Sequence, residues 1–162
     1  MTPFDKAFDA LMLIEGGYSN SASDKGGETK YGISRRSYPH LKIADLTLVE
    51  ARQIYLHDFW LIIHLDMIRH PDVAGEIFEQ AVNFGPGEAV EIAQRALGYL
   101  GKPTLVDGVM GPVTREALNS YPHKDALLKT LNGFQFMRYV EIVKADPRQK
   151  ENARGWLRRI EI

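Results

Sequence analysis

Apolar residues at the start of the chain recur at the three- and four-residue steps of an amphipathic helix. They are Phe4, Ala7, Phe8, Leu11 and Ile14. Thr2 can cap this helix, and Pro3 suits its first turn. Glu15 follows four residues after Leu11, so the spacing places its carboxyl on the apolar face. The alternative is that the side chain turns to water where the helix ends.

Similar periodicity predicts helices along most of the remaining chain. Thr47 and Glu50 have the spacing of a capping box, and the helix that they start continues to about Phe59. The apolar run at residues 59–63 is expected to be buried. Further helices are expected near residues 73–82, 88–100, 112–118, 124–144 and 151–160. Only residues 28–34 favour a strand, so we expect a mainly α-helical fold.

Composition limits the possible partners. The 162 residues are 44% hydrophobic, which suits one compact domain or a lobe with a small module. A net charge of −1 gives no basic footprint for nucleic acid. There is no cysteine, and no histidine pair has metal-ligand spacing with a carboxylate partner, so neither a disulfide nor a metal site is expected.

No stretch approaches the ~20 apolar residues of a membrane span. The N-terminal stretch carries Asp5, Lys6 and Asp9 and lacks the pattern of a signal peptide. We therefore expect no membrane partner and synthesis in the cytoplasm without export by the general secretory route.

Two carboxylates of unlike setting stand close together in residues 15–33. A Glu15 carboxyl among apolar residues has a raised pKa and stays protonated, as a general acid must. Asp24 lies among serines and glycines, where a carboxylate stays ionised, although a simple turn residue would look the same. Thr29 can orient a water molecule, and Glu28 is a rival to Asp24 as the second carboxylate. Such a pair suits hydrolysis of a glycosidic bond.

The pattern E-G-G-Y-x5-D-x-G-G-x-T-x-Y-G-I, from Glu15 to Ile33, resembles the N-terminal signature of glycoside hydrolase family 108 muramidases. These are lysozyme-like enzymes of phage endolysins and related bacterial proteins. The resemblance implies that Glu15 is the catalytic acid, that no cofactor is needed, and that a short β-hairpin follows Glu15 in a lysozyme-like helical fold. The spacing Glu-x8-Asp-x4-Thr is one residue shorter than the corresponding triad of phage-type lysozymes.

A second motif runs from Asp107 to Leu118, D-G-x-x-G-P-x-T-x-x-A-L, and resembles peptidoglycan-binding modules. Asp107-Gly108 is typical of a tight turn and Pro112 of a helix start. We expect a catalytic lobe over residues 1–64 and a peptidoglycan-binding-like helical region over residues 65–162. Since no Gly/Ser- or Pro-rich tether separates them, the second region is expected to pack on the lobe.

The resemblance implies a monomeric muramidase that cleaves the β-1,4 bond between N-acetylmuramic acid and N-acetylglucosamine in a peptidoglycan glycan strand. Tyr18, Tyr31 and Glu28 are candidates to line the sugar site. An endolysin made in the host cytoplasm would reach the periplasmic wall after holin-type release. The alternatives are a lytic transglycosylase, which also needs an acidic glutamate, and a non-catalytic wall-binding or secretion-activator protein.

Overall fold

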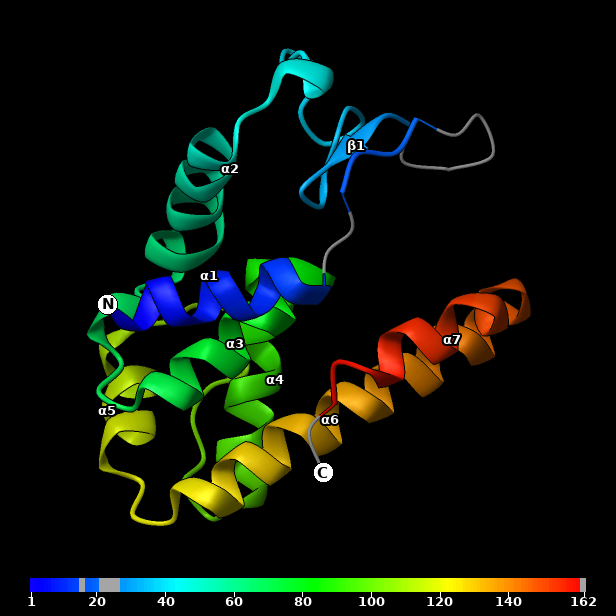
Figure 1. Ribbon diagram of the computed structural model, residues 1–162. Coiled ribbons are helices and arrows are strands. Elements are labelled where there is room, and N and C mark those ends of the chain that lie inside the picture. The colour runs from blue at the N-terminus through cyan, green and yellow to red at the C-terminus, as the bar shows by residue number, and fades with distance from the viewer. Residues whose placement is uncertain (15–16, 21–26, 161–162) are drawn as a thin grey trace. The chain divides into compact units, whose positions relative to one another are not determined.

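The computed structural model describes residues 1–14, 17–20 and 27–160 (Figure 1). The chain divides into two compact units, Met1–Asp58 and Phe59–Ile162. Within the described residues there are seven α-helices and one sheet of two short strands. The prediction of a mainly helical fold with a small β-hairpin is confirmed.

Both α-helices of the first unit begin with the caps expected from the sequence. In α1 (Pro3–Ile14), the Thr2 hydroxyl accepts from the Asp5 backbone N–H at 3.1 Å, and the Asp5 carboxylate accepts from the Thr2 N–H at 2.7 Å. In α2 (Leu48–Tyr55), Thr47 and Glu50 form the predicted capping box. Such reciprocal bonds satisfy helix N–H groups that have no partner within the helix.

Helices α1 and α2 are joined by aromatic and charged side chains. The rings of Phe8 and Tyr55 lie with their centroids 5.8 Å apart, and both side chains are buried. Arg52 pairs with Asp5 and lies over the Phe4 ring, 5.1 Å from its centroid. The apolar face predicted for the first helix is thus the face of α1 that packs against α2.

The sheet of the first unit is an antiparallel hairpin of β1 (Thr29–Lys30) and β2 (Ile33–Ser34). The expectation of one strand over residues 28–34 is wrong in detail, because Tyr31 and Gly32 turn the chain. Both have positive φ, 53° and 77°, as a two-residue type I′ turn requires. Ile33 is buried, and its side chain anchors the hairpin in the core.

Short helical turns follow α2, at Leu56–Trp60, Leu61–Ile63 and Leu65–Met67. The expectation that residues 59–63 are all buried is wrong: Trp60 and Ile63 are buried, whereas Ile62 is 61% exposed and Leu61 is 36% exposed. The reason is geometric. A 3₁₀ turn has three residues, so positions three apart share a face and those between them point elsewhere.

Three packed helices form the core of the second unit: α3 (Pro71–Phe84), α4 (Pro86–Tyr99) and α6 (Lys124–Ala145). Small residues on the facing surfaces of α3 and α4 let the two helices approach closely. The buried ones are Ala74, Ala81, Ala89, Ala93 and Ala96.

Two shorter helices complete the second unit, α5 (Pro112–Ser120) and α7 (Lys150–Leu157). Figure 1 shows α7 running back alongside the C-terminal half of α6. The Trp156 ring stacks on Tyr139 of α6, with centroids 5.2 Å apart. This contact holds α7 against α6.

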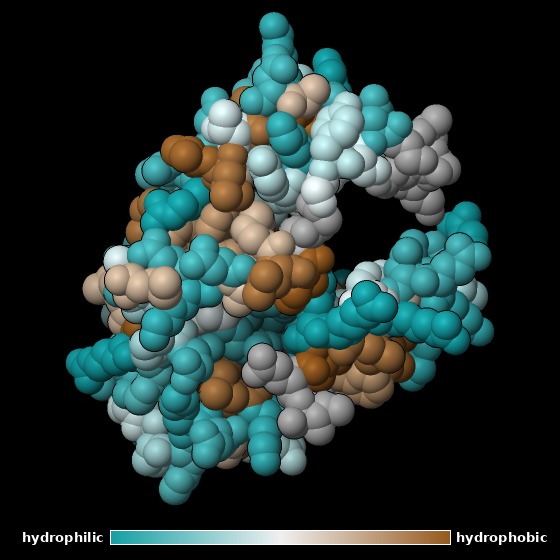
Figure 2. Space-filling view, viewed as in Figure 1, coloured by the Kyte–Doolittle hydropathy of each residue, from teal (hydrophilic) through white to brown (hydrophobic). Residues whose placement is uncertain are grey.

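The face in Figure 2 is mostly hydrophilic, with apolar side chains interrupted by polar ones. No helix among the described residues has the length and apolar character needed to cross a membrane.

Candidate functional site

Four of the six predicted site residues lie in the hairpin region of the first unit: Tyr18, Glu28, Thr29 and Tyr31. Glu15 and Asp24 lie outside the described residues, so their catalytic roles stay predictions. The described residues of the hairpin region flank both of them in the sequence.

Ser19 pairs with Thr29 and extends the hairpin on its outer side. The two residues exchange backbone hydrogen bonds, each 2.8 Å long, as an antiparallel bridge does. Tyr18 and Glu28, which each precede one of these partners, are therefore diagonal neighbours on the same face, although they are ten residues apart in the chain.

Glu28 makes the central polar contacts of this region. Its Oε1 accepts from the Tyr18 hydroxyl at 2.9 Å, and its Oε2 accepts from Arg35 Nη1 at 3.2 Å. The Arg35 backbone N–H also donates to the Glu28 carbonyl at 2.8 Å. The Glu28 side chain is only 13% exposed. A carboxylate with both oxygens engaged is suited to orient its neighbours rather than to attack a sugar or to activate water.

Tyr18 presents its ring to solvent while its hydroxyl is held. The side chain is 51% exposed. The hydrogen bond to Glu28, followed by desolvation, raises the pKa of the Tyr18 hydroxyl above 10.0. The hydroxyl therefore stays protonated and keeps donating at neutral pH, which restricts the direction of the exposed ring.

Thr29 and Tyr31 occupy different parts of the hairpin. The Thr29 hydroxyl donates to the Gly27 carbonyl at 3.2 Å, which leaves its own lone pairs able to accept from a water molecule. The Tyr31 carbonyl accepts from the Tyr55 hydroxyl at 3.0 Å, which ties the turn to α2. Lys30 Nζ lies 5.6 Å from the centroid of the Tyr31 ring.

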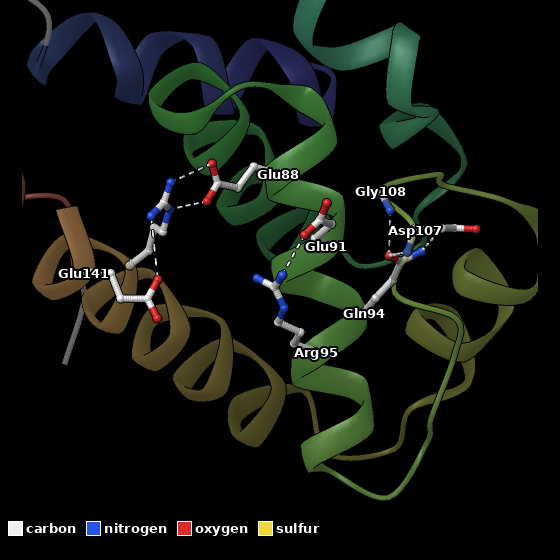
Figure 3. A network of polar contacts seen from close by, with 8 residues as sticks. Glu88, Glu91, Gln94, Arg95, Asp107, Gly108 and Glu141 are labelled. Carbon is white, nitrogen blue, oxygen red and sulfur yellow. Dashed lines mark hydrogen bonds and ion pairs between the residues drawn. The ribbon is translucent and has the colours of Figure 1, made fainter. Parts of the chain in front are cut away.

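Gln94 of α4 organises the second motif (Figure 3). Its Nε2 donates to Asp107 Oδ1 at 2.8 Å, to the Val109 carbonyl at 3.1 Å and to Thr114 Oγ1 at 3.2 Å. Its Oε1 accepts from the backbone N–H groups of Asp107 at 2.9 Å and Gly108 at 3.1 Å. Gln94 is only 1% exposed. One buried amide thus fixes the loop between α4 and α5.

The tight turn predicted at Asp107-Gly108 is present, and Pro112 starts α5 as expected. Gly108 has φ of +71°, and a Cβ there would lie 3.1 Å from the Gly87 carbonyl oxygen, so the position requires glycine. Hydrogen bonds from the Val109 N–H and from Gln94 lower the pKa of Asp107. Asp107 is therefore a structural carboxylate of the turn.

Charged pairs lie along α4, between α4 and α6, and within α6. Arg138 of α6 pairs with Glu88 and with Glu141, and Glu91 pairs with Arg95 one turn further along α4 at 2.7 Å (Figure 3). The pair between Glu91 and Arg95 is exposed, so it contributes little to stability.

A second polar network lies inside the second unit and was not expected from the sequence. Glu79 of α3 accepts from Arg159 at 2.9 Å, from Asn83 at 2.7 Å and from Gln135 at 2.7 Å. Glu79 and Arg159 are 15% and 13% exposed. Gln135 also donates to the Tyr139 hydroxyl at 3.2 Å. The network joins α3, α6 and the segment after α7.

Metal-ligating side chains do not gather in the part of the chain that the structure describes: no group of three or more His, Asp or Glu is placed to hold an ion there.

Family comparisons divide the chain into two consecutive matches. Residues 8–85 match the family described as Glycosyl hydrolase 108, and residues 88–161 match the family described as Predicted Peptidoglycan domain. Residues 8–85 thus belong to glycosyl hydrolase family 108. The family resemblance drawn from the Glu15–Ile33 signature is thereby confirmed.

A solved structure supports the same assignment. The structure described as that of Brucella abortus SagA superposes on this family 108 chain with a TM-score of 0.78 and 25% sequence identity. The match covers 97% of this chain and 88% of SagA. It confirms the lysozyme-like helical fold. No curated protein matches the chain.

The two matches make this chain a cell-wall hydrolase of the glycoside hydrolase class, with peptidoglycan as its ligand. The family matches meet between α3 and α4, whereas the compact units divide after Asp58. The expected division of roles between residues 1–64 and 65–162 stays a prediction.

Proposed function

We propose that this family 108 hydrolase is an N-acetylmuramidase, which cleaves the β-1,4 bond between N-acetylmuramic acid and N-acetylglucosamine. The observation that carries the proposal is the Glu15–Ile33 signature within the matched hydrolase region, residues 8–85. The peptidoglycan-domain match over residues 88–161 supports the same substrate.

Glu15 protonates the glycosidic oxygen as the sugar bond breaks, and Asp24 stabilises the positive charge on the sugar ring or positions water. Water adds to the anomeric carbon, and its proton passes to a carboxylate, Asp24 if the anomeric configuration is inverted or Glu15 if it is retained. Thr29 lies at the start of the hairpin with a hydroxyl able to accept from that water. The exposed ring of Tyr18 offers an apolar face to a pyranose.

Delivery to the wall is a separate part of the proposal. An endolysin role, with a holin-type partner that releases the enzyme from the host cytoplasm to the periplasmic wall, follows from the family resemblance alone. The same holds for action as a monomer.

Product chemistry separates the candidate functions. Purified sacculi are incubated with the protein, and the released fragments are analysed by liquid chromatography and mass spectrometry. A muramidase releases fragments with a reducing N-acetylmuramic acid end, whose mass includes the added water. Anhydro-muramic ends would instead assign a lytic transglycosylase. Co-sedimentation with sacculi and no released fragments would assign a wall-binding protein.

A further inference from the structure

The hairpin and the segment after it carry an excess of positive charge. Residues 27–42 contain four bases, Lys30, Arg35, Arg36 and Lys42, and one acid, Glu28, which gives a formal charge of +3. The whole chain has a net charge of −1. The region around the predicted sugar site is therefore locally cationic in a protein with no general attraction for anions.

Arg35 is the cation of this region that is joined to the predicted sugar-site residues. Its side chain is 60% exposed, and only Nη1 is engaged, by Glu28. Among the described residues no other acceptor holds the guanidinium. A guanidinium has five N–H donors in a planar fork that matches a carboxylate. Most of the fork therefore remains available to an anionic group from solution.

One carboxylate fixes both Arg35 and Tyr18. The Tyr18 hydroxyl is 2.9 Å from Glu28 Oε1, and Arg35 Nη1 is 3.2 Å from Oε2. Glu28 thus holds both the exposed ring of Tyr18 and the partly free guanidinium of Arg35. A sugar ring can stack on Tyr18 while Arg35 binds a carboxylate that the sugar carries.

We propose that Tyr18, Glu28 and Arg35 form a subsite for a carboxylate-bearing sugar of the glycan strand. Tyr18 supports the pyranose, Arg35 binds the carboxylate, and Glu28 is the positioning residue that orients both. The inference rests on the proposed function and deepens it by naming a group that the substrate must carry. Two peptidoglycan carboxylates fit, one on the stem peptide and one on the lactyl group of muramic acid once the peptide is removed.

Arg36 provides a matched control. It is the next residue, it is exposed, and it forms no ion pair with any described residue. Arg36→Gln removes the same charge from the same segment without touching the Tyr18–Glu28–Arg35 cluster. A general effect of positive charge would raise KM equally in the Arg35 and Arg36 variants. A subsite raises KM in the Arg35 variant only.

The test uses the full-length protein and four forms of purified sacculi. These are native sacculi, sacculi with carboxyls amidated chemically, sacculi stripped of stem peptides by an amidase, and stripped sacculi that are then amidated. The apparent KM and kcat of glycan cleavage are measured for the parent, Arg35→Gln, Arg35→Lys and Arg36→Gln. Thermal melting of each variant confirms that it is folded.

We expect Arg35→Gln to raise KM on native sacculi about tenfold with kcat within about twofold, and Arg35→Lys to restore part of the loss because a point charge replaces the fork. Arg36→Gln should change KM less than about twofold. The parent should bind amidated sacculi as weakly as Arg35→Gln does. Because the lactyl carboxyl is amide-linked in native sacculi, a loss on native sacculi assigns a stem-peptide carboxylate. Tight binding of stripped sacculi that amidation then abolishes would show that the lactyl carboxylate can take its place.

Equal KM values of the parent on native and amidated sacculi would overturn the proposal. So would equal losses in Arg35→Gln and Arg36→Gln. Co-sedimentation with the same four substrates measures the discrimination without catalysis. If the parent cleaves none of the substrates, the proposed function fails. The co-sedimentation measurement still decides whether Arg35 recognises a carboxylate.

Discussion

Glu28 bonds to Tyr18 through one carboxylate oxygen and to Arg35 through the other. This engagement bears on which carboxylate assists Glu15. A catalytic base or nucleophile must be accessible to water or to the anomeric carbon, whereas the Glu28 side chain is only 13% exposed and is paired with Arg35. Glu28 is therefore poorly suited to that role, and the assignment of Asp24, which lies outside the described residues, stays a prediction.

We predict that Asp24→Asn lowers kcat on sacculi roughly 10²-fold or more, whereas Glu28→Gln mainly raises KM. The amide introduced by Glu28→Gln can still accept from Tyr18 but no longer carries the charge that holds Arg35. Steady-state cleavage of purified sacculi separates the two effects. A severe kcat loss in Glu28→Gln with a nearly normal Asp24→Asn would reverse the assignment.

The Glu79 network makes a prediction about pH. Burial raises the pKa of Glu79 above its ordinary 4.5, although Arg159, Gln135 and Asn83 all donate to the carboxylate. A raised pKa means that the folded state binds the proton more tightly than the unfolded chain does. The resulting stabilisation is complete below about pH 4.5 and is lost as the pH rises through the raised value.

We therefore expect the stability of the parent relative to Glu79→Gln to fall as the pH rises from about 4 to 7. Arg159→Met should cost about 3 kcal/mol or more at neutral pH, since it leaves a buried charge unpaired, and adding Glu79→Gln should restore most of the loss. Urea unfolding at several pH values measures both. If the unfolding free energy of the parent instead rose relative to that of Glu79→Gln as the pH increased, the prediction would be wrong.

At the scale of elements, the loop between α4 and α5 depends on one buried amide. Gln94 makes five hydrogen bonds to Asp107, Gly108, Val109 and Thr114. Gln94→Ala leaves several of these groups without partners, so we predict a loss of about 2 kcal/mol or more in unfolding free energy.

Arg95→Gln is the matched control for Gln94→Ala, because it is the next residue of α4 and breaks only the exposed pair with Glu91. It should cost no more than about 0.5 kcal/mol. Chemical denaturation monitored by tryptophan fluorescence compares the two variants. Equal losses would show that the Gln94 contacts do not determine the stability of the loop.

Local elements were predictable from the sequence, and long-range contacts were not. The Thr47–Glu50 capping box and the starts at Pro3 and Pro112 follow from residues within one turn of each other. The Gln94 contacts span 13 to 20 residues, and Arg159 is 80 residues from Glu79. No local pattern marks such pairs, because a buried glutamine and an exposed one look alike in sequence.

The same limit holds at the candidate site. The signature predicted which residues gather near the hairpin, and Glu28 was named both as a rival carboxylate and as a sugar-site residue. Its bonds to Tyr18 and Arg35 depend on the pairing of Ser19 with Thr29 and on the turn at Tyr31. A strand expected to run straight through residues 28–34 would have carried Arg35 away from Glu28.

At the scale of the whole molecule, the family boundary does not follow the packing. Helix α3 belongs to the hydrolase match, but it packs on α4 and α6, which belong to the peptidoglycan-domain match. The buried α3 residues Val73, Ile77 and Phe78 are part of that shared core. A cut between the two matched regions would therefore divide one hydrophobic core.

We predict that a fragment of residues 1–85 aggregates or melts without cooperativity, since α3 would expose its apolar face. A fragment of residues 59–162, one complete compact unit, should unfold cooperatively. The shorter fragment 1–64 should not lyse sacculi alone, because a lobe of that size buries only ~60% of its unfolded surface. Circular dichroism melting and a lysis assay check these outcomes. A soluble, lytic fragment 1–64 would show two independent modules instead.

The proposed muramidase activity depends on Glu15 as the acid that protonates the glycosidic oxygen. The most direct measurement is the clearing of a turbid suspension of purified sacculi by the parent and by Glu15→Gln at equal concentration. The variant keeps the size and hydrogen bonding of the side chain but removes the transferable proton, so clearing should slow by ~10²–10⁴-fold or more while the melting temperature stays unchanged. A folded Glu15→Gln protein that clears sacculi as fast as the parent would contradict the account.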